Sequence, residues 1–226
     1  MSNRDLEYLV RNLVREGILH TDEYIKAFLK VDRKLFVWPG YEKYAYMDNP
    51  LPLGNTGQTI SAPHMYGYMT EALKPKPGEI ILEIGSGSGY QAALLTEIVA
   101  GEDVGEKGFI YTVEIDPVLV KFARDNIRRA GYNKYVKVIY GDGSMGWPPN
   151  YKGELYDGIL VTAAAPDILK PLLNQLKIGG RLVSPVGRGY FQDLIKVIKV
   201  GDNKYKREYL IKCAFVPLRG RFGWNE

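Results

Sequence analysis

Two stripes of apolar residues open the chain. Within residues 4–16 the apolar side chains recur at three- and four-residue spacing, which predicts a helix that Gly17 can terminate. A second stripe follows Thr21, which we expect to be the N-cap of another helix with acidic residues in its first turn. Residues 38–63 keep no sustained period and are rich in Gly, Pro, Asn and Tyr, so we predict an ordered loop region there.

From residue 79 onward, short apolar strands alternate with helical stretches. The predicted strands cover 80–82, 109–115, 136–140 and 158–161, and the predicted helices cover 92–99, 118–127 and 168–176. Three further strands are expected over 182–186, 194–200 and 209–216, with only a turn between the last two. The pattern predicts an α/β fold with a doubly wound, Rossmann-like, mostly parallel seven-stranded sheet, an antiparallel C-terminal hairpin and N-terminal helices.

Composition and charge narrow the class of protein. A chain of 226 residues fits one α/β unit, in which we expect residues 1–78 to hold the N-terminal helices and an active-site loop and residues 79–226 the core. No apolar run approaches the roughly 20 residues that span a bilayer, and no signal peptide is apparent, so we expect a cytoplasmic protein. The 30 basic and 26 acidic residues are interspersed, unlike the basic stripe of a nucleic-acid binder. With Cys213 as the single cysteine and only two histidines, we predict no metal site.

A glycine-rich turn carries the strongest chemical signal. Gly85, Gly87 and Gly89 alternate between a predicted strand and a predicted helix. Glycines there permit positive φ angles and let a ligand approach the backbone, while the helix presents free N–H groups. The alternative is a tight turn with no ligand. We predict a bound nucleotide-like molecule.

The spacing of the glycines and the nearby acids suggest which molecule binds. The pattern is G-x-G-x-G, whereas dinucleotide-binding loops have G-x-G-x-x-G. Glu83 precedes the first glycine, and a carboxylate there suits the cationic S-adenosylmethionine better than a pyrophosphate. Glu114, at the end of the next strand, is predicted to bind the ribose hydroxyls. Asp142 can accept from the adenine amino group or can equally be a turn residue before Gly143.

At this point the chain resembles the class I methyltransferases, and more narrowly the protein-L-isoaspartate O-methyltransferase family. Besides the glycine turn, the matching segments are 59–65, 141–143, 156–159, 162–164, 176–183 and 216–218. The resemblance implies an S-adenosylmethionine-dependent protein carboxyl O-methyltransferase. It would methylate the α-carboxylate of L-isoaspartyl residues in damaged proteins and so start repair through a succinimide.

The resemblance also implies roles for individual residues. Ser61 is the implied catalytic residue, and Val216–Leu218 would offer backbone to the substrate peptide. The implied substrate-binding residues are Thr59, Ser61, Val216, Pro217 and Leu218. The implied or predicted cofactor-binding residues are Ile60, His64, Glu83, Gly85, Ser86, Gly87, Ser88, Gly89, Glu114, Asp142 and Gly143.

Several alternatives stay open at the sequence level. Ser61 can be the N-cap of a helix that begins at Pro63, and His64 can be a polar residue of an ordered loop. A nucleic-acid methyltransferase is suggested by Trp147–Asn150, but that signature belongs at the end of the fourth strand. A noncatalytic adaptor is the other rival. The segments that carry the resemblance end at Leu218, so it implies no role for residues 219–226, and the sequence indicates no oligomeric state.

Overall fold

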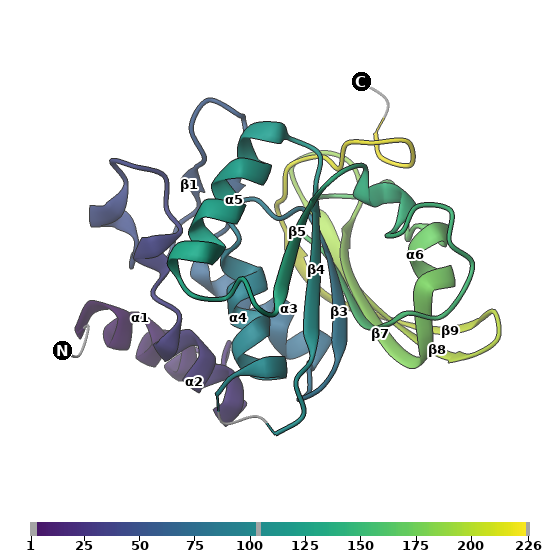
Figure 1. Ribbon diagram of the computed structural model, residues 1–226, viewed down its shortest axis with the longest axis horizontal. Coiled ribbons are helices and arrows are strands. Elements are labelled where there is room, and N and C mark those ends of the chain that lie inside the picture. The colour runs from purple at the N-terminus through teal and green to yellow at the C-terminus, as the bar shows by residue number, and fades with distance from the viewer. Residues whose placement is uncertain (1–3, 103–104, 225–226) are drawn as a thin grey trace.

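The computed structural model describes residues 4–102 and 105–224 (Figure 1). The helices are α1 (Arg4–Arg15), α2 (Asp22–Lys30), α3 (Pro63–Leu73), α4 (Tyr90–Ala100), α5 (Pro117–Arg129) and α6 (Lys170–Gln175). The strands are β1 (Leu51–Pro52), β2 (Thr59–Ile60), β3 (Ile80–Ile84), β4 (Phe109–Glu114), β5 (Val136–Tyr140), β6 (Tyr156–Val161), β7 (Leu176–Val186), β8 (Gln192–Gly201) and β9 (Lys204–Cys213). Over these residues, no helix has the length and apolar character needed to cross a membrane.

Seven strands form one sheet in the order β5-β4-β3-β6-β7-β8-β9. The pairs from β5 through β7 are parallel, and β8 and β9 join antiparallel. The parallel strands therefore end at the same edge of the sheet, where the β–α turns gather. The predicted fold class, including the antiparallel C-terminal hairpin, is confirmed.

Successive residues of the strands pack into two separate hydrophobic cores, one on each face of the sheet. Ile81 and Leu160 belong to the core that contains α1 to α5, whereas Leu82 and Ile159 belong to the core under α6. Figure 1 shows α3, α4 and α5 on one face of the sheet and α6 on the other. Burial on both faces explains why these strands are apolar at successive positions.

The hairpin strands differ from the predicted bounds. Strand β9 begins at Lys204 rather than at residue 209. The prediction missed its first five residues because four of them are charged, as is usual for an edge strand. It ends at Cys213, so 214–216 is not part of it. Strand β7 begins at Leu176, directly after α6, instead of at residue 182. Apolar periodicity does not detect such polar or glycine-containing strand ends.

Two local expectations for the N-terminal region need revision. Thr21 does precede α2, but its hydroxyl donates to Glu71 Oε2 at 2.8 Å and does not cap the helix. Glu71, from α3, also accepts the backbone N–H groups of His20 and Thr21. The loop region at 38–63 contains the short antiparallel pair β1–β2, which the sequence did not predict.

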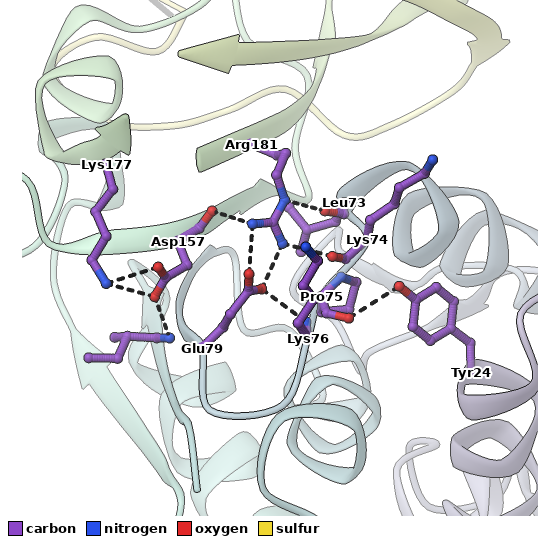
Figure 2. A network of polar contacts seen from close by, with 10 residues as sticks. Tyr24, Leu73, Lys74, Pro75, Lys76, Glu79, Asp157, Lys177 and Arg181 are labelled. Atoms are coloured by element: carbon purple, nitrogen blue, oxygen red, sulfur yellow. Dashed lines mark hydrogen bonds and ion pairs between the residues drawn. The ribbon is translucent and has the colours of Figure 1, made fainter. Parts of the chain in front are cut away.

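Arg181 joins several segments at the amino end of the parallel strands (Figure 2). Its guanidinium donates to the carbonyls of Leu73 and Lys74 at 2.8 Å and of Asp157 at 3.0 Å. It also contacts both oxygens of Glu79, at 2.6 and 2.8 Å. This cluster fixes the end of α3 to the sheet on the side opposite the β–α turns.

Candidate functional site

A cleft opens where β3, β4 and β6 end, at the edge that carries the glycine turn. We call it the glycine-turn cleft. It is lined by Gln58, Thr59, Ile84, Gly85, Gly87, Val113, Glu114, Ile115, Leu119, Gly143, Thr162, Ala163, Val216, Pro217, Leu218 and Arg219. Ligands of open α/β sheets bind at this edge.

The glycine turn requires its glycines. Gly85, Gly87 and Gly89 have φ angles of +96°, +51° and +87°, which side chains with a Cβ rarely adopt. A Cβ at Gly85 would collide with the hydroxyl of Thr162, which donates to the Gly85 carbonyl at 2.8 Å. The Gly89 N–H closes the turn on the Ser86 carbonyl at 2.7 Å. The turn thus presents glycine backbone, with no side chain of its own, to the cleft.

Glu114 lies at the end of β4 and lines the cleft. Its Oε2 accepts from the Gly87 N–H at 2.9 Å, and its Oε1 accepts from the N–H groups of Ile115 and Asp116 at 2.9 and 3.0 Å. A carboxylate has about four acceptor positions. Three are therefore used by backbone, which fixes the side chain and leaves one position for a ligand hydroxyl.

Glu83 is placed differently from Glu114. It is buried beneath the glycine turn and does not line the cleft. Its Oε2 lies 2.5 Å from the Thr112 hydroxyl, which is 2.7 Å from the Ser86 hydroxyl. Burial raises the pKa of Glu83 to about 8. Any effect of this carboxyl on a ligand must pass through the turn and not through direct contact.

Ser86, Ser88 and Gly89 shape the turn from within, because none of them lines the cleft. Both serines are buried, and the Ser88 hydroxyl accepts from the Tyr90 N–H at 3.3 Å, at the start of α4. Ile60 is likewise buried and outside the cleft. These residues hold the backbone that the ligand would meet.

The contacts of Asp142 are those of a turn residue, which was one of the two roles that the sequence left open. Its Oδ1 accepts from the N–H and hydroxyl of Ser144, at 2.9 and 2.6 Å. Its Oδ2 accepts from the Arg221 N–H at 2.7 Å. Gly143 lines the cleft, whereas Asp142 does not. Asp142 therefore caps its own turn and anchors the C-terminal segment.

The C-terminal segment 219–224 folds against the cleft, which the sequence did not predict. Arg219 lines the cleft and lies 3.6 Å from Asp116. Trp224 Nε1 donates to the Ala164 carbonyl at 2.8 Å, and the Phe222 N–H donates to the Ser144 hydroxyl at 3.0 Å. Isolated polar contacts of this kind have no spacing that a sequence pattern could reveal. Residues 225–226 lie outside the described residues.

A second cavity, of about 600 Å³, contains Ser61, and we call it the Ser61 groove. It is lined by Pro50, Thr59, Ser61, Ala62, His64, Met65, Thr162, Gly189, Tyr190, Phe191, Lys212, Cys213, Ala214, Phe215 and Val216. Thr59, Thr162 and Val216 line both this groove and the glycine-turn cleft. The two cavities therefore meet at these three residues.

The backbone of Ser61 is held by two buried side chains. Its N–H donates to the Tyr66 hydroxyl at 3.1 Å, and its carbonyl accepts from Arg33 at 3.0 Å. Arg33 is fully buried and also donates to the carbonyls of Ala45 and Asn49, at 2.6 and 3.2 Å. Sequence reasoning missed Arg33 and Tyr66, because a single arginine or tyrosine whose partners are backbone groups has no signature in the sequence.

The N-cap alternative for Ser61 is wrong, because the residue that precedes α3 is Ala62 and no side chain caps this helix. The local effect of Pro63 was correctly expected, since α3 begins at that residue. Ser61 is instead part of the wall of its groove.

His64 lines the Ser61 groove and not the glycine-turn cleft. Its Nδ1 lies 3.0 Å from both carboxylate oxygens of Asp48, and its N–H donates to Asp48 at 2.9 Å. The Asp48 hydrogen bond raises the pKa of His64. Burial alone would raise the pKa of Asp48, but the contacts with His64 outweigh it and lower that pKa. The pair favours a protonated imidazole at the groove.

The segment Val216–Leu218 already has a backbone partner. The Ala164 N–H donates to the Val216 carbonyl, and the Leu218 N–H donates to the Ala164 carbonyl, both at 2.8 Å. Within the described part of the chain, the Val216 N–H and the Pro217 carbonyl make no hydrogen bond. A peptide bound here would use these two groups, so any backbone pairing must be short.

Comparisons with known proteins agree over nearly the whole chain. The family model described as Protein-L-isoaspartate(D-aspartate) O-methyltransferase matches residues 3–223. A protein-L-isoaspartate O-methyltransferase of Staphylothermus marinus is 53% identical over 95% of this chain and 93% of its own length. One of Hyperthermus butylicus is 50% identical over 96% of this chain and 90% of its own length.

Solved structures give the same picture. A Plasmodium falciparum structure in complex with S-adenosyl-L-homocysteine has a TM-score of 0.81 at 28% identity, covering 94% of this chain and 97% of that chain. Another, described as a protein-L-isoaspartate O-methyltransferase, has a TM-score of 0.83 at 30% identity, covering 96% of this chain and 67% of that chain.

Proposed function

The chain belongs to the protein-L-isoaspartate(D-aspartate) O-methyltransferase family, and on that premise we propose how its own residues carry out the reaction. The enzyme transfers a methyl group from S-adenosylmethionine to the α-carboxylate of L-isoaspartyl residues in damaged proteins, which starts repair through a succinimide. The observation that carries the assignment of roles is the junction of the two cavities at Thr59, Thr162 and Val216.

The glycine-turn cleft fits S-adenosylmethionine by the chemistry of its lining. Glu114 offers its remaining acceptor position to a ribose hydroxyl, and Ile115 and Leu119 offer an apolar wall to the adenine. Gly85 and Gly87 let the methionine part approach the backbone. When bound, the cofactor supplies an electrophilic methyl group on a positively charged sulfur.

The Ser61 groove receives the acceptor carboxylate. An α-carboxyl group has a pKa below 4 and is already ionised at pH 7, so no general base is needed. The Ser61 hydroxyl orients its oxygens, and His64, whose pKa the Asp48 hydrogen bond raises, lines the same groove. Orientation of this kind contributes about 7–11 kcal/mol in favourable cases.

Linkage selectivity follows from the short backbone contact. An isoaspartyl linkage adds one methylene to the peptide backbone and presents the α-carboxylate as a short branch. The Val216 N–H and the Pro217 carbonyl would hold the peptide while its carboxylate reaches the junction. A normal aspartyl carboxylate is displaced by about an ångström, which can cost on the order of 100-fold in rate.

The test is a radiolabel transfer assay with paired peptides that differ only in the isoaspartyl or aspartyl linkage. We expect methylation of the isoaspartyl member to be faster by about two orders of magnitude. Ser61→Ala should lower turnover roughly tenfold or more, because a hydrogen bond to a charged carboxylate is lost. Ser184→Ala, which removes a buried hydroxyl outside both cavities, is the control. Equal rates on the two linkages would contradict the proposed acceptor geometry.

The organisation and partners complete the proposal. Residues 1–78 supply the Ser61 side of the groove, and residues 79–226 supply the cofactor-binding core and the opposite wall of the groove, as one compact unit. Thr59, from the N-terminal part, lines both cavities, which supports a single compact unit. The partners are isoaspartyl-containing proteins and peptides rather than nucleic acids or membranes, and the enzyme acts in the cytoplasm.

A further inference from the structure

Two aromatic side chains project into solvent from the loop between β7 and β8. Tyr190 is 93% exposed and Phe191 is 73% exposed. Both line the Ser61 groove. Adjacent exposed aromatic residues at the rim of a cavity are a typical mark of a binding surface.

The base of this loop is well anchored, so the aromatic residues have a defined position beside the groove. Gln192 is buried, and its Nε2 donates to the Gly189 carbonyl at 2.7 Å while its Oε1 accepts from the Phe215 N–H at 2.8 Å. The Gly187 N–H donates to the Ala165 carbonyl at 3.0 Å. Gln192 thereby connects the loop to the segment that contains Val216.

The charges around the groove indicate the chemistry of its occupant. Among the described residues that line it, the ionisable side chains are His64, Tyr190, Lys212 and Cys213, and there is no carboxylate. Lys212 is paired with Asp193 at 2.6 Å, and His64 is paired with Asp48. The remaining wall is largely apolar and includes Met65 and Phe215. Such a surface suits an apolar side chain better than a cationic one.

We propose that Tyr190 and Phe191 bind an apolar or aromatic side chain next to the isoaspartyl residue of the substrate and thereby set a preference for flanking sequence. The proposal rests on the proposed function, because the groove must hold an isoaspartyl peptide. The aromatic pair continues the same groove that contains Ser61, so a peptide whose carboxylate lies at Ser61 passes the two rings.

The experiment compares two isoaspartyl hexapeptides, one with phenylalanine on both sides of the isoaspartyl residue and one with serine there. The wild type should have a kcat/KM roughly three- to tenfold higher for the phenylalanine peptide. The double variant Tyr190→Ser/Phe191→Ser should lose this preference, so that its kcat/KM falls more on the phenylalanine peptide than on the serine peptide. Tyr209→Ser removes an aromatic residue that is about as exposed as Phe191 and lines neither cavity, and should keep the preference.

Three results would overturn the proposal. The first is a wild type without preference, and the second is a double variant that keeps the preference or loses rate equally on both peptides. The third is a change of mass in solution by light scattering for the double variant, which would identify the rings as a contact between copies of the chain. If the wild type methylates neither peptide, that result contradicts the proposed function as well as the proposed role of Tyr190 and Phe191.

Discussion

Two arginines lie at opposite ends of the parallel strands, and they differ in burial and partners, because Arg33 is fully buried and Arg181 is only partly buried. Arg181, at the amino end, contacts the Glu79 carboxylate as well as backbone carbonyls (Figure 2). Arg33, in the loops at the carboxyl end, donates only to carbonyls, and its Nε has no hydrogen-bond partner among the described residues. Burial lowers the pKa of Arg33. Arg181 is paired with a carboxylate, whereas Arg33, beneath Ser61, makes no direct ion pair among the described residues and has Asp48 as its nearby carboxylate.

The different partners of the two arginines indicate that one acts on stability and the other on the active site. At the amino end the ion pair fixes α3 to the sheet and touches neither cavity. At the carboxyl end Arg33 donates to the carbonyls of Ala45 and Asn49, from the loop before β1, and of Ser61, from the connection between β2 and α3. Burying a charge without a paired carboxylate costs free energy. A gain in stability therefore does not explain Arg33, whereas the positioning of Ser61 does. We therefore expect Arg181 to contribute mainly to stability and Arg33 mainly to turnover.

Replacing Arg181 should have the largest effect. Arg181→Met leaves the Glu79 carboxylate and three carbonyls without their donor, which should lower the free energy of unfolding by about 3–5 kcal/mol. Urea unfolding measures this loss. Activity per folded molecule should not change. Lys177→Met, at the more exposed edge of the same cluster, should cost less than about 1 kcal/mol and is the control. Similar losses for the two variants would contradict the assignment.

Replacing Arg33 should have the next largest effect, on turnover. Arg33→Lys keeps a positive charge but cannot bridge three carbonyls, so Ser61 should shift relative to the junction of the cavities. A shift of about an ångström can lower kcat about 100-fold, whereas the cofactor Kd should change little. Arg124→Lys is a matched control, because Arg124 also donates to a backbone carbonyl, but that of Val138, which lines neither cavity. An unchanged kcat would show that Arg33 does not position Ser61.

The two ends of the sheet were also unequally predictable from sequence. The strands of the seven-stranded sheet, apart from the first residues of β7 and β9, most helices and the glycine turn follow from apolar periodicity and from glycines that need positive φ. Arg33 and Tyr66 were not predicted, because their partners are backbone groups that lie close only in the folded chain. Glu83 could be placed near the turn, but its burial away from the cleft depends on side-chain packing. Local patterns reveal elements, whereas contacts between loops depend on tertiary structure.

Replacing Glu114 tests the carboxyl end from the cofactor side. Glu114→Gln introduces an amide donor where three backbone N–H groups and a ribose hydroxyl need acceptors. Loss of charge-assisted hydrogen bonds should weaken S-adenosylmethionine binding roughly tenfold or more, measured by titration calorimetry. Asp125→Asn, at an exposed carboxylate of α5, should leave the Kd unchanged. If Glu114→Gln also binds normally while the fold is intact, the ribose role is refuted.

The smallest expected effect concerns Glu83 and pH. Because its folded pKa is raised to about 8, above the ordinary 4.5, the folded protein keeps the proton that the unfolded chain releases between these values. The stability contribution of Glu83 is therefore fully present below about pH 4.5 and is lost as the pH rises toward 8. Glu83→Gln should make the free energy of unfolding less dependent on pH within this window. Identical pH profiles for the variant and the wild type would refute the raised pKa.

The same carboxyl should link cofactor affinity to pH. A cationic ligand above the glycine turn favours ionised Glu83, so S-adenosylmethionine should bind about fivefold more tightly at pH 8 than at pH 7. Calorimetry in two buffers of different ionisation enthalpy should detect the released proton. Adenosine, which carries neither the sulfonium nor the ammonium, should bind with no such pH dependence. Glu83→Gln should abolish the dependence for S-adenosylmethionine. If the variant retains it, the proton comes from another group, and Glu83 belongs with Arg181 among the residues that act on stability.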